Sequence, residues 1–444
     1  PISICVISEI GYRSLPVKEY FGEYFYCPIH VLQLAREKCP NKKIVVMLNE
    51  KDVRLVDLDM LLDPCAGLVD MVRLAVDPDN LSRASLLSSE IMTRGFEVGL
   101  NVMYMSKWLD DPIFMGKLAD VKANFISMID SYGGIYPQDI DNAIHEIKKV
   151  TSIPLGFHGH NNLELALANT IEAINKGCEM VDATITGMGR GAGNLKTELL
   201  LTYLDSKNLI DFKYGNLTSI VDEFMSIQKE YFWGTSLPYM ISGAYSLPQK
   251  EVMSWIAKKR YTTESIINAL QNHKKQQPAS LGIQKFSIDK KVEKIVIVGG
   301  GINAKKHAHA LKQFSHSNPE TVIIHAGVRY ISLFQELSNK QYVCLLGAEG
   351  YKMKPFLLAK NTVNYTFIIE PSPHLMGIII PEGILAQTFE LTEISLFDDF
   401  PDSLLTIAFQ IADLLDAKDI FLFGLDGYDI KKDEQMLEVS QENQ

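Results

Sequence analysis

Two histidines in the middle of the chain are the side chains best suited to hold a metal ion. They are His158 and His160, in the string Gly156-Phe157-His158-Gly159-His160-Asn161-Asn162. Residues two apart on a strand point to the same side of a sheet, so both imidazoles can converge on one ion. Histidines that only fill a core are the alternative, but the flanking Gly and Asn residues at a strand end favour a metal site.

A glycine-rich segment follows this string after the next apolar run. It reads Asp182-Ala183-Thr184-Ile185-Thr186-Gly187-Met188-Gly189-Arg190-Gly191-Ala192-Gly193-Asn194. Gly189, Gly191 and Gly193 allow the loop to approach a ligand closely, and the helix that follows offers its N-terminus to an anion. Asn194 is placed to reach the metal or its water. A tight turn that only requires positive φ needs the same glycines, so both interpretations stay open.

Repeated strand and helix units must position these residues. Up to about Leu204, short apolar runs alternate with amphipathic segments such as 163–175, which indicates a parallel sheet. The predicted strands are 4–10, 44–48, 71–76, 97–102, 124–129, 153–157 and 180–184. Seven such units suggest a (β/α)8 barrel one unit short, with its active site at the C-terminal edge of the strands. A doubly wound open sheet is the alternative.

The rest of the chain predicts a second domain. We expect the barrel to occupy 1–208, a helical segment 209–272, a polar linker 273–290, and a Rossmann-like α/β domain 291–444. The predicted strands of this domain are 294–298, 321–325, 342–346, 365–369 and 420–423, with helices at 304–314 and 403–415. A strand, a glycine-rich turn and a helix in that order are typical of phosphate-binding α/β folds.

The candidate binding residues of the second domain are Gly299, Gly301 and Asp426. The two glycines belong to Gly299-Gly300-Gly301-Ile302-Asn303-Ala304, directly after the first strand. No acidic residue ends the next strand where a ribose partner is expected, which weakens a dinucleotide interpretation. Asp426 follows the last strand and could bring a carboxylate to the same edge for a metal or a sugar hydroxyl. Turn formation is the commoner role of an Asp-Gly pair.

The composition favours a folded protein that acts on small molecules. Its 444 residues exceed one ordinary domain, and 47% hydrophobic against 22% charged residues can fill two cores. A net charge of -11 disfavours nucleic acid or an anionic membrane as the main partner. No apolar run reaches the roughly 18 residues of a membrane span. The six scattered cysteines match no disulfide or zinc pattern and indicate a cytoplasmic protein.

Taken together, the histidine string and the glycine-rich segment resemble the metal-dependent aldolases and lyases that include 4-hydroxy-2-oxovalerate aldolase and hydroxymethylglutaryl-CoA lyase. Three further strings fit the same family pattern: Asp130-Ser131-Tyr132-Gly133, Tyr136-Pro137 and Glu9-Ile10-Gly11-Tyr12. The resemblance covers roughly residues 8–258 and is closest to the 4-hydroxy-2-oxoacid aldolase branch. Nothing in the chain resembles the cysteine-bearing loop of the CoA lyases.

This resemblance implies a divalent ion, Mn²⁺ or Mg²⁺, held by two histidines and one aspartate. The ion would chelate a 2-oxo acid and stabilise the pyruvate enolate released when the carbon–carbon bond breaks. The partners would be a small 2-oxo acid and an aldehyde, and a homo-oligomer is left open. Ser131 and Tyr245 are the catalytic candidates, the latter because a tyrosine from the helical segment reaches the site in this branch. A core tyrosine is the alternative.

One family motif has no counterpart in the sequence. Members open with a strand that ends in Asp-x-Thr-x-Arg-Asp-Gly, which supplies the metal-binding Asp and an Arg that steadies the enolate. Here Pro1 to Ile7 leads directly into the string that begins at Glu9. We therefore expect a barrel without its first βα unit, either because an N-terminal piece is missing or because the chain is a degenerate relative.

Two other functions remain open at this stage. In the first, the barrel is a catalytically impaired scaffold and the C-terminal domain binds a nucleotide or a nucleotide-sugar. In the second, the chain is an acyl-CoA condensing enzyme of the Claisen type.

Overall fold

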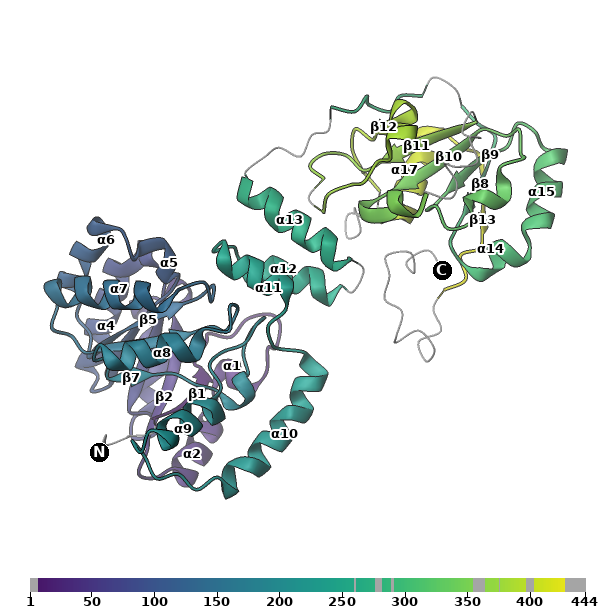
Figure 1. Ribbon diagram of the computed structural model, residues 1–444. Helices are drawn as coiled ribbons and strands as arrows, with labels where there is room; N and C mark the ends of the chain where they lie inside the picture. The colour runs from purple at the N-terminus through teal and green to yellow at the C-terminus, as the bar shows by residue number, and fades with distance from the viewer. Residues whose placement is uncertain are drawn as a thin grey trace. The chain divides into compact units, whose positions relative to one another are not determined.

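The computed structural model describes residues 7–258, 261–275, 282–288, 291–353, 364–374, 376–396 and 403–427 (Figure 1). The chain forms two compact units, Pro1–Gln249 and Lys250–Gln444. The first three residues of the predicted strand 4–10 lie outside the described ranges. Each unit is built around its own parallel sheet.

The first unit contains seven parallel strands that pair in sequence order. They are β1 (Ile7–Tyr12), β2 (Lys43–Asn49), β3 (Met71–Val76), β4 (Glu97–Val102), β5 (Phe125–Asp130), β6 (Leu155–Gly159) and β7 (Met180–Val181). Sequential order excludes the doubly wound alternative, in which the strand order reverses. The curled sheet is that of a TIM barrel lacking its first βα unit, which confirms the predicted fold class.

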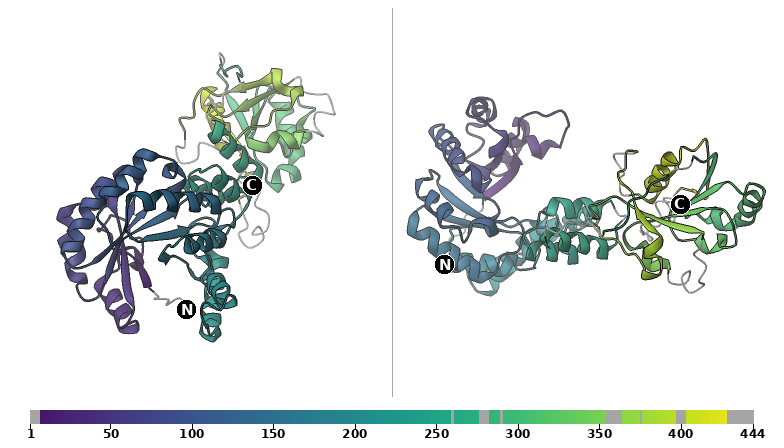
Figure 2. Two further views of the ribbon diagram at one scale, coloured as in Figure 1. Left: turned by 60° about the vertical axis from the view of Figure 1, so that its left-hand side comes forward. Right: turned by 90° about the horizontal axis from the view of Figure 1, so that it is seen from above.

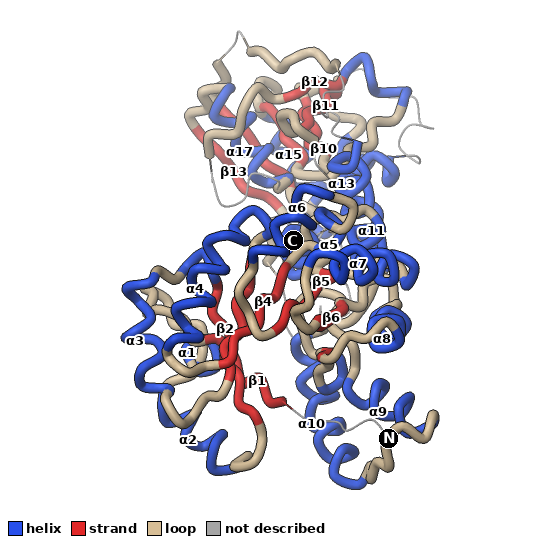
Figure 3. The backbone as a smooth tube through the Cα atoms, turned by 90° about the vertical axis from the view of Figure 1, so that its left-hand side faces the viewer, coloured by secondary structure: helices blue, strands red, loops and turns tan. Residues whose placement is uncertain are grey.

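Helices cover the outer side of this curled sheet (Figures 2 and 3). The longest are α2 (Ile29–Lys38), α4 (Leu81–Thr93), α7 (Pro137–Val150), α8 (Ala166–Asn175) and α9 (Thr197–Ser206), with α1 (Glu23–Tyr26), α3 (Leu58–Leu62), α5 (Met105–Trp108) and α6 (Pro112–Lys117) between them. The apolar faces of α2, α4 and α7 and the strands form one buried core, and α9 packs in a smaller cluster with the start of α8. Strands β3 and β5 are buried at every position, as expected for a parallel sheet.

The last two strands of the first unit differ from the prediction at their ends. Strand β6 extends to Gly159 and so includes His158, whereas the predicted strand ended at Phe157. Strand β7 is only two residues long, because Thr184 donates its backbone N–H to the carbonyl of Leu195 (2.9 Å) instead of extending the pairing with β6. The glycine-rich segment is thereby folded back against the sheet edge.

The second unit contains six parallel strands in the order β12-β11-β10-β9-β8-β13. They are β8 (Lys294–Val298), β9 (Val322–His325), β10 (Gln341–Leu345), β11 (Tyr365–Ile369), β12 (Thr388–Glu390) and β13 (Asp419–Phe423), with α14 (Ile302–Lys306), α15 (Ala308–Ser317) and α17 (Leu404–Leu414) as the main helices. Helix α17 and one face of the sheet form a buried core. Strand order reverses between β8 and β13, and ligands bind open α/β sheets beside such a point.

Three boundary predictions for the second unit need correction. The predicted linker 273–290 contains Phe286, which is buried in the core and donates its N–H to the carbonyl of Glu390 (2.8 Å). The predicted helix 304–314 is divided into α14 and α15 at His307. Strand β12 was not predicted, because a three-residue strand carries no recognisable apolar pattern.

The predicted helical segment 209–272 is divided between the two units. Helices α10 (Gly215–Tyr231) and α11 (Leu237–Ala244) belong to the first unit. Helix α13 (Thr263–Lys275) and all but the first residue of α12 (Gln249–Ala257) belong to the second.

Candidate active site

The two histidines of the central string lie together at the carboxyl end of β6. His158 is in the strand, His160 follows its last residue, and their ring centroids are 5.2 Å apart. The pleat of the strand places both rings on one side, as their spacing of two predicted. In a barrel this edge of the sheet carries the active site.

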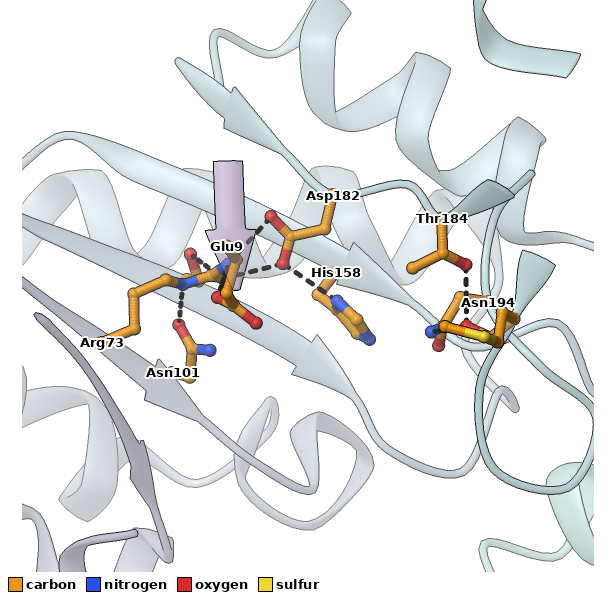
Figure 4. A network of polar contacts seen from close by, with 9 residues as sticks. Glu9, Arg73, Asn101, His158, Asp182, Thr184 and Asn194 are labelled. Atoms are coloured by element: carbon orange, nitrogen blue, oxygen red, sulfur yellow. Dashed lines mark hydrogen bonds and ion pairs between the residues drawn. The ribbon is translucent and has the colours of Figure 1, made fainter. Parts of the chain in front are cut away.

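A buried ion-pair network holds the first of these histidines (Figure 4). Asp182, just after β7, accepts from His158 Nδ1 (2.9 Å) and from Arg73 Nη2 (2.7 Å). Arg73 also donates from Nη1 to Glu9 Oε2 (3.0 Å) and from Nε to Asn101 Oδ1 (2.8 Å). Strands β1, β3, β4, β6 and the residue after β7 thus share one polar network across the sheet.

The charges of this network keep Asp182 ionised. Burial by itself would raise the pKa of Asp182, but the charge of Arg73 and the hydrogen bond from His158 outweigh it, so the pKa lies well below its usual range. Burial likewise disfavours the charge on Arg73, and Asp182 and Glu9 reverse that effect and raise its pKa. The pKa of Glu9 is raised, because burial exceeds the opposing effect of Arg73.

An ionised Asp182 fixes the tautomer of His158. A carboxylate is only an acceptor, so the proton of the His158 ring must lie on Nδ1, and the lone pair lies on Nε2. His160 is a neutral imidazole, because burial above all, together with the charge of Arg190, lowers its pKa to about 3. Its Nδ1 is buried and has no hydrogen-bond partner among the described residues. Each histidine therefore offers a lone pair.

These two donors fit a divalent metal ion. Metal-binding histidines commonly donate their other ring N–H to a carboxylate, which orients the ring and raises its basicity. The hydrogen bond between His158 and Asp182 has this form. No group of three or more His, Cys, Asp or Glu side chains within the described ranges is placed to hold a metal. The donor set is therefore two imidazoles, without the third ligand that the missing aspartate motif would supply.

Hydrogen bonds fasten the glycine-rich loop beside His160. Asn161 donates its N–H to the carbonyl of Gly193 (2.9 Å), and Asn194 donates its N–H to that of Gly187 (2.9 Å). Gly193 adopts a φ of 79°, and a Cβ there would lie 2.4 Å from the Gly187 oxygen. This position therefore requires glycine, which supports the tight-turn interpretation of the segment.

The other loop residues also serve the turn. The Asn194 side chain donates from Nδ2 to the carbonyl of Met188 (2.9 Å), while its Oδ1 is buried without a partner among the described residues. A Cβ on Gly189 would lie 2.5 Å from that Nδ2. Gly191 has a φ of 60° and lies against Gln249. The loop is compact, and one amide oxygen within it remains open.

The two catalytic candidates come from different elements of the first unit. Ser131 follows β5, and its Oγ accepts the backbone N–H of Tyr104 (2.9 Å), so this hydroxyl oxygen links two βα loops. Tyr245 directly follows the last residue of α11, and 36% of it is exposed. Helix α11 packs on the β6 edge, because Asn162 Nδ2 donates to the carbonyl of Tyr239 (3.0 Å). The catalytic role of both residues stays a prediction.

Three residues of this region were missed by the sequence analysis as functional groups. Arg73 and Asn101 are part of the network around Asp182, and an arginine within the apolar run of β3 was the available signal. Asp130, the last residue of β5, is buried and accepts backbone N–H groups from Gly134 and Ile135. Burial raises the pKa of Asp130 to about 6, against these hydrogen bonds.

The candidate residues of the second unit lie together at the carboxyl ends of β8 and β13. Gly299 donates its N–H to the carbonyl of Phe423 (2.8 Å), and Asp426 Oδ2 accepts the N–H of Asn303 (2.8 Å) at the start of α14. A Cβ on Gly301 would lie 2.5 Å from Asp426 Cγ. The carboxylate thus occupies the place at which an anion would meet this turn.

A cavity beside the same turn is small. It measures about 10 Å³, room for about one water molecule, and is lined by Gly299, Gly300, Gly327 and Arg329 among others. Arg329 Nη1 donates to the carbonyl of Gly300 (3.1 Å). Side chains of the chain itself fill the glycine-rich turn.

Comparison with known proteins adds an independent line of evidence. A family model described as HMGL-like matches residues 95–222, which includes both histidines and the glycine-rich loop. Within the described ranges, none of the helices combines the length and apolar character that a bilayer crossing requires.

Individual relatives agree with the family model. A 4-hydroxy-2-oxovalerate aldolase of Bacillus cereus is 30% identical over 209 residues, which are 46% of this chain and 60% of the relative. An oxaloacetate decarboxylase of Mycobacterium tuberculosis is 30% identical over 167 residues, or 35% of this chain and 50% of the relative. The chain thus spans 50 to 60% of the length of these curated relatives.

One solved structure is more similar. It is the N-terminal domain of a proposed aldolase from Bacteroides vulgatus, with 50% sequence identity and a TM-score of 0.55. The match covers 59% of this chain and 87% of that domain.

Proposed function

Since this chain belongs to the HMGL-like family of TIM-barrel aldolases, we propose that it is a divalent-metal-dependent carbon–carbon lyase. Its substrate in the cleavage direction is a 4-hydroxy-2-oxo acid, and its products are pyruvate and an aldehyde. The names of the relatives support an aldolase or, more generally, a lyase. The specific substrate and the ion, Mn²⁺ or Mg²⁺, are part of the proposal.

The hydrogen bond between His158 and Asp182 is the observation that carries this proposal. It keeps the proton on Nδ1 of His158, so that Nε2 is available to an ion beside the open Nδ1 of His160. Arg73 holds Asp182 in place and keeps it ionised. A structural histidine pair would not need a carboxylate and a buried guanidinium to fix its tautomer.

The reaction that suits this arrangement breaks the bond between C3 and C4 of the 4-hydroxy-2-oxo acid. The 4-hydroxyl loses its proton, C4 becomes the aldehyde carbon, and the electron pair of the broken bond remains on the pyruvate fragment as an enolate. A proton added at C3 then gives pyruvate. A divalent ion at the histidines would act as a Lewis acid that stabilises the enolate charge. Asp182 would hold the His158 proton at Nδ1 throughout.

Two predicted catalytic residues remain part of the proposal. Tyr245 would reach the substrate from the end of α11, which packs on the edge of β6. Ser131 would act through its hydroxyl proton, since its Oγ already accepts the N–H of Tyr104.

Exchange of the pyruvate methyl protons tests the function. The protein is incubated with pyruvate in D₂O, with and without Mn²⁺ or Mg²⁺, and exchange is followed by NMR. We expect exchange only with the metal, and His158→Ala should reduce the rate to background. His145→Ala is the matched control, because His145 is exposed on α7 in the same unit. If the wild-type protein shows no metal-dependent exchange, the proposed function is wrong.

The two alternative functions have less support. A nucleotide or nucleotide-sugar at the C-terminal domain would have to compete with Asp426 for the turn before α14. Calorimetry with a panel of nucleotides tests that prediction, and release of free thiol from acetyl-CoA tests the Claisen-type prediction.

A further inference from the structure

Two arginines lie near the candidate metal-binding histidines, and their surroundings differ. Arg73 is buried, with 6% of its side chain exposed, and it forms ion pairs with both Asp182 (2.7 Å) and Glu9 (3.0 Å). Its donors Nε, Nη1 and Nη2 all have acceptors within the sheet. The N–H groups of Arg73 are therefore already engaged and are not available to an anionic substrate.

Arg190 is the contrasting case. It is exposed, and the described part of the chain contains no hydrogen bond or ion pair to its guanidinium. Its backbone is fixed nevertheless, because its carbonyl accepts the N–H of Gly193 (3.1 Å) and the Gly193 carbonyl accepts the N–H of Asn161 (2.9 Å). The Cα of Arg190 is held in the loop beside His160, while the side chain keeps its donors.

The position of Arg190 brings its charge to the histidine edge. The hydrogen bonds that run from Arg190 through Gly193 end on Asn161, which directly follows His160. The nearby network contains two carboxylates, Glu9 and Asp182, against one guanidinium, Arg73. Arg73 is taken up by these two carboxylates, whereas the donors of Arg190 remain available to an anionic substrate.

We propose that Arg190 binds the carboxylate of the 2-oxo acid. This inference rests on the proposed function and extends it by naming the residue that selects an acid over an uncharged ketone. A guanidinium suits the task, because its planar fork donates two parallel hydrogen bonds to one carboxylate.

A comparison of two ligands and several variants tests this role without turnover. Pyruvate and its uncharged analogue methyl pyruvate are titrated into the full chain with Mg²⁺, and the dissociation constants are measured by saturation-transfer NMR. The variants are Arg190→Ala and Arg190→Lys. Lys196→Ala is the matched control, because it removes the same charge from an exposed residue six positions further along the chain.

We expect the wild-type protein to prefer pyruvate and Arg190→Ala to reduce that preference by about tenfold or more. Affinity for methyl pyruvate should change little. Arg190→Lys should restore part of the preference, because it returns the charge without the fork, and Lys196→Ala should retain all of it. A general loss of folding would weaken the binding of both ligands equally. The ratio of the two dissociation constants therefore reports on the carboxylate contact alone.

The other outcomes are distinguishable. If the wild type prefers pyruvate and Arg190→Ala prefers it by the same factor, Arg190 does not bind the carboxylate, and the proposed function is unaffected. If the wild type binds neither ligand with Mg²⁺ present, both the proposed function and the role of Arg190 are wrong.

Discussion

The two sheets of this chain carry glycine-rich turns at their carboxyl edges, and the two turns leave different atoms open. Beside the turn of the first unit, His160 Nδ1 and Asn194 Oδ1 are buried without partners among the described residues. At the turn of the second unit, Asp426 accepts the N–H of Asn303 and Arg329 donates to Gly300. The first turn lies beside two acceptor atoms without partners, and the second is closed by its own side chains.

Two histidines with lowered pKa values show the same contrast. His160 and His325 both have a lowered pKa because they are buried. His325 Nε2 is hydrogen bonded to Gln341 Oε1 (2.8 Å), and its ring packs against Phe334. Burial alone therefore does not mark a ligand-binding histidine. The informative feature is the partner of each ring nitrogen, since His158 Nδ1 pairs with the Asp182 carboxylate and His160 Nδ1 has no hydrogen-bond partner among the described residues.

The comparison predicts the largest loss of stability for a variant that removes the buried cation of the first unit. Arg73→Ala leaves the carboxylates of Asp182 and Glu9 without their partner in a largely buried place. Removing one partner of a buried ion pair costs about 3–5 kcal/mol, and we expect the lower part of that range because Glu9 is partly exposed. Urea unfolding followed by tryptophan fluorescence measures the loss, since two of the three tryptophans, Trp108 and Trp233, lie in the first unit.

Arg329→Ala is the matched control in the second unit. Arg329 is exposed and makes one hydrogen bond to a backbone carbonyl, so its removal should cost less than about 1 kcal/mol. Equal decreases in the free energy of unfolding for the two variants would contradict the view that only the first turn lies beside a buried charge network.

The pH dependence of the second unit is the next largest effect. Burial lowers the pKa of His325 to about 4 in the folded chain, whereas the ordinary histidine value is about 6.5. The unfolded state therefore binds the proton more readily, and stability is complete above about pH 6.5 and falls as the pH drops toward 4. The full difference is up to about 3 kcal/mol.

A series of urea unfolding curves between pH 7 and pH 4 measures this dependence, with a probe in the second unit. His325→Gln removes the titrating ring and should flatten the curve over the same range. If wild type and variant lose stability in parallel, the histidine is not the group responsible, and the two buried histidines do not differ in the way described.

Much of the fold followed from apolar patterns in the sequence. Strands 71–76, 97–102, 294–298 and 365–369 were predicted with their observed bounds, because a buried parallel strand reads as a continuous apolar run between turn residues. Strand β7 was predicted too long, since pairing of Thr184 with Leu195 depends on a loop that returns from eleven residues away. Phe286 was assigned to a linker because a single apolar residue among polar neighbours forms no pattern that indicates burial.

The candidate site was predicted only where its residues are close in sequence. His158 and His160 share one strand end, so their spacing was sufficient. Arg73 contributes from a strand 109 positions before Asp182, and no local pattern connects them. The protonation of His158 likewise depends on this distant pair. Spacing predicted the two imidazoles as candidate metal ligands, and only the folded chain showed what orients His158.

The smallest predicted effect concerns the closed turn of the second unit. Asp426→Ala removes the carboxylate that accepts the N–H of Asn303, and loss of such a cap costs about 1 kcal/mol. Thermal unfolding of the second unit should show a correspondingly small decrease. Asp426→Asn is the control. It keeps an acceptor oxygen without the charge and should therefore retain most of the stability that Asp426→Ala loses.

The same two variants show whether the negative charge of Asp426 or the packing of its side chain keeps a phosphate out of the turn. If the carboxylate excludes phosphate, calorimetry should show no ADP binding to the wild type and weak binding to both Asp426→Ala and Asp426→Asn. If the packing of Asp426 against Gly301 also closes the turn, only the alanine variant should bind. Tight binding of ADP by the wild type would show that the Asp426 side chain moves aside. The second turn would then be able to bind a ligand, and the proposed contrast between the two turns would be wrong.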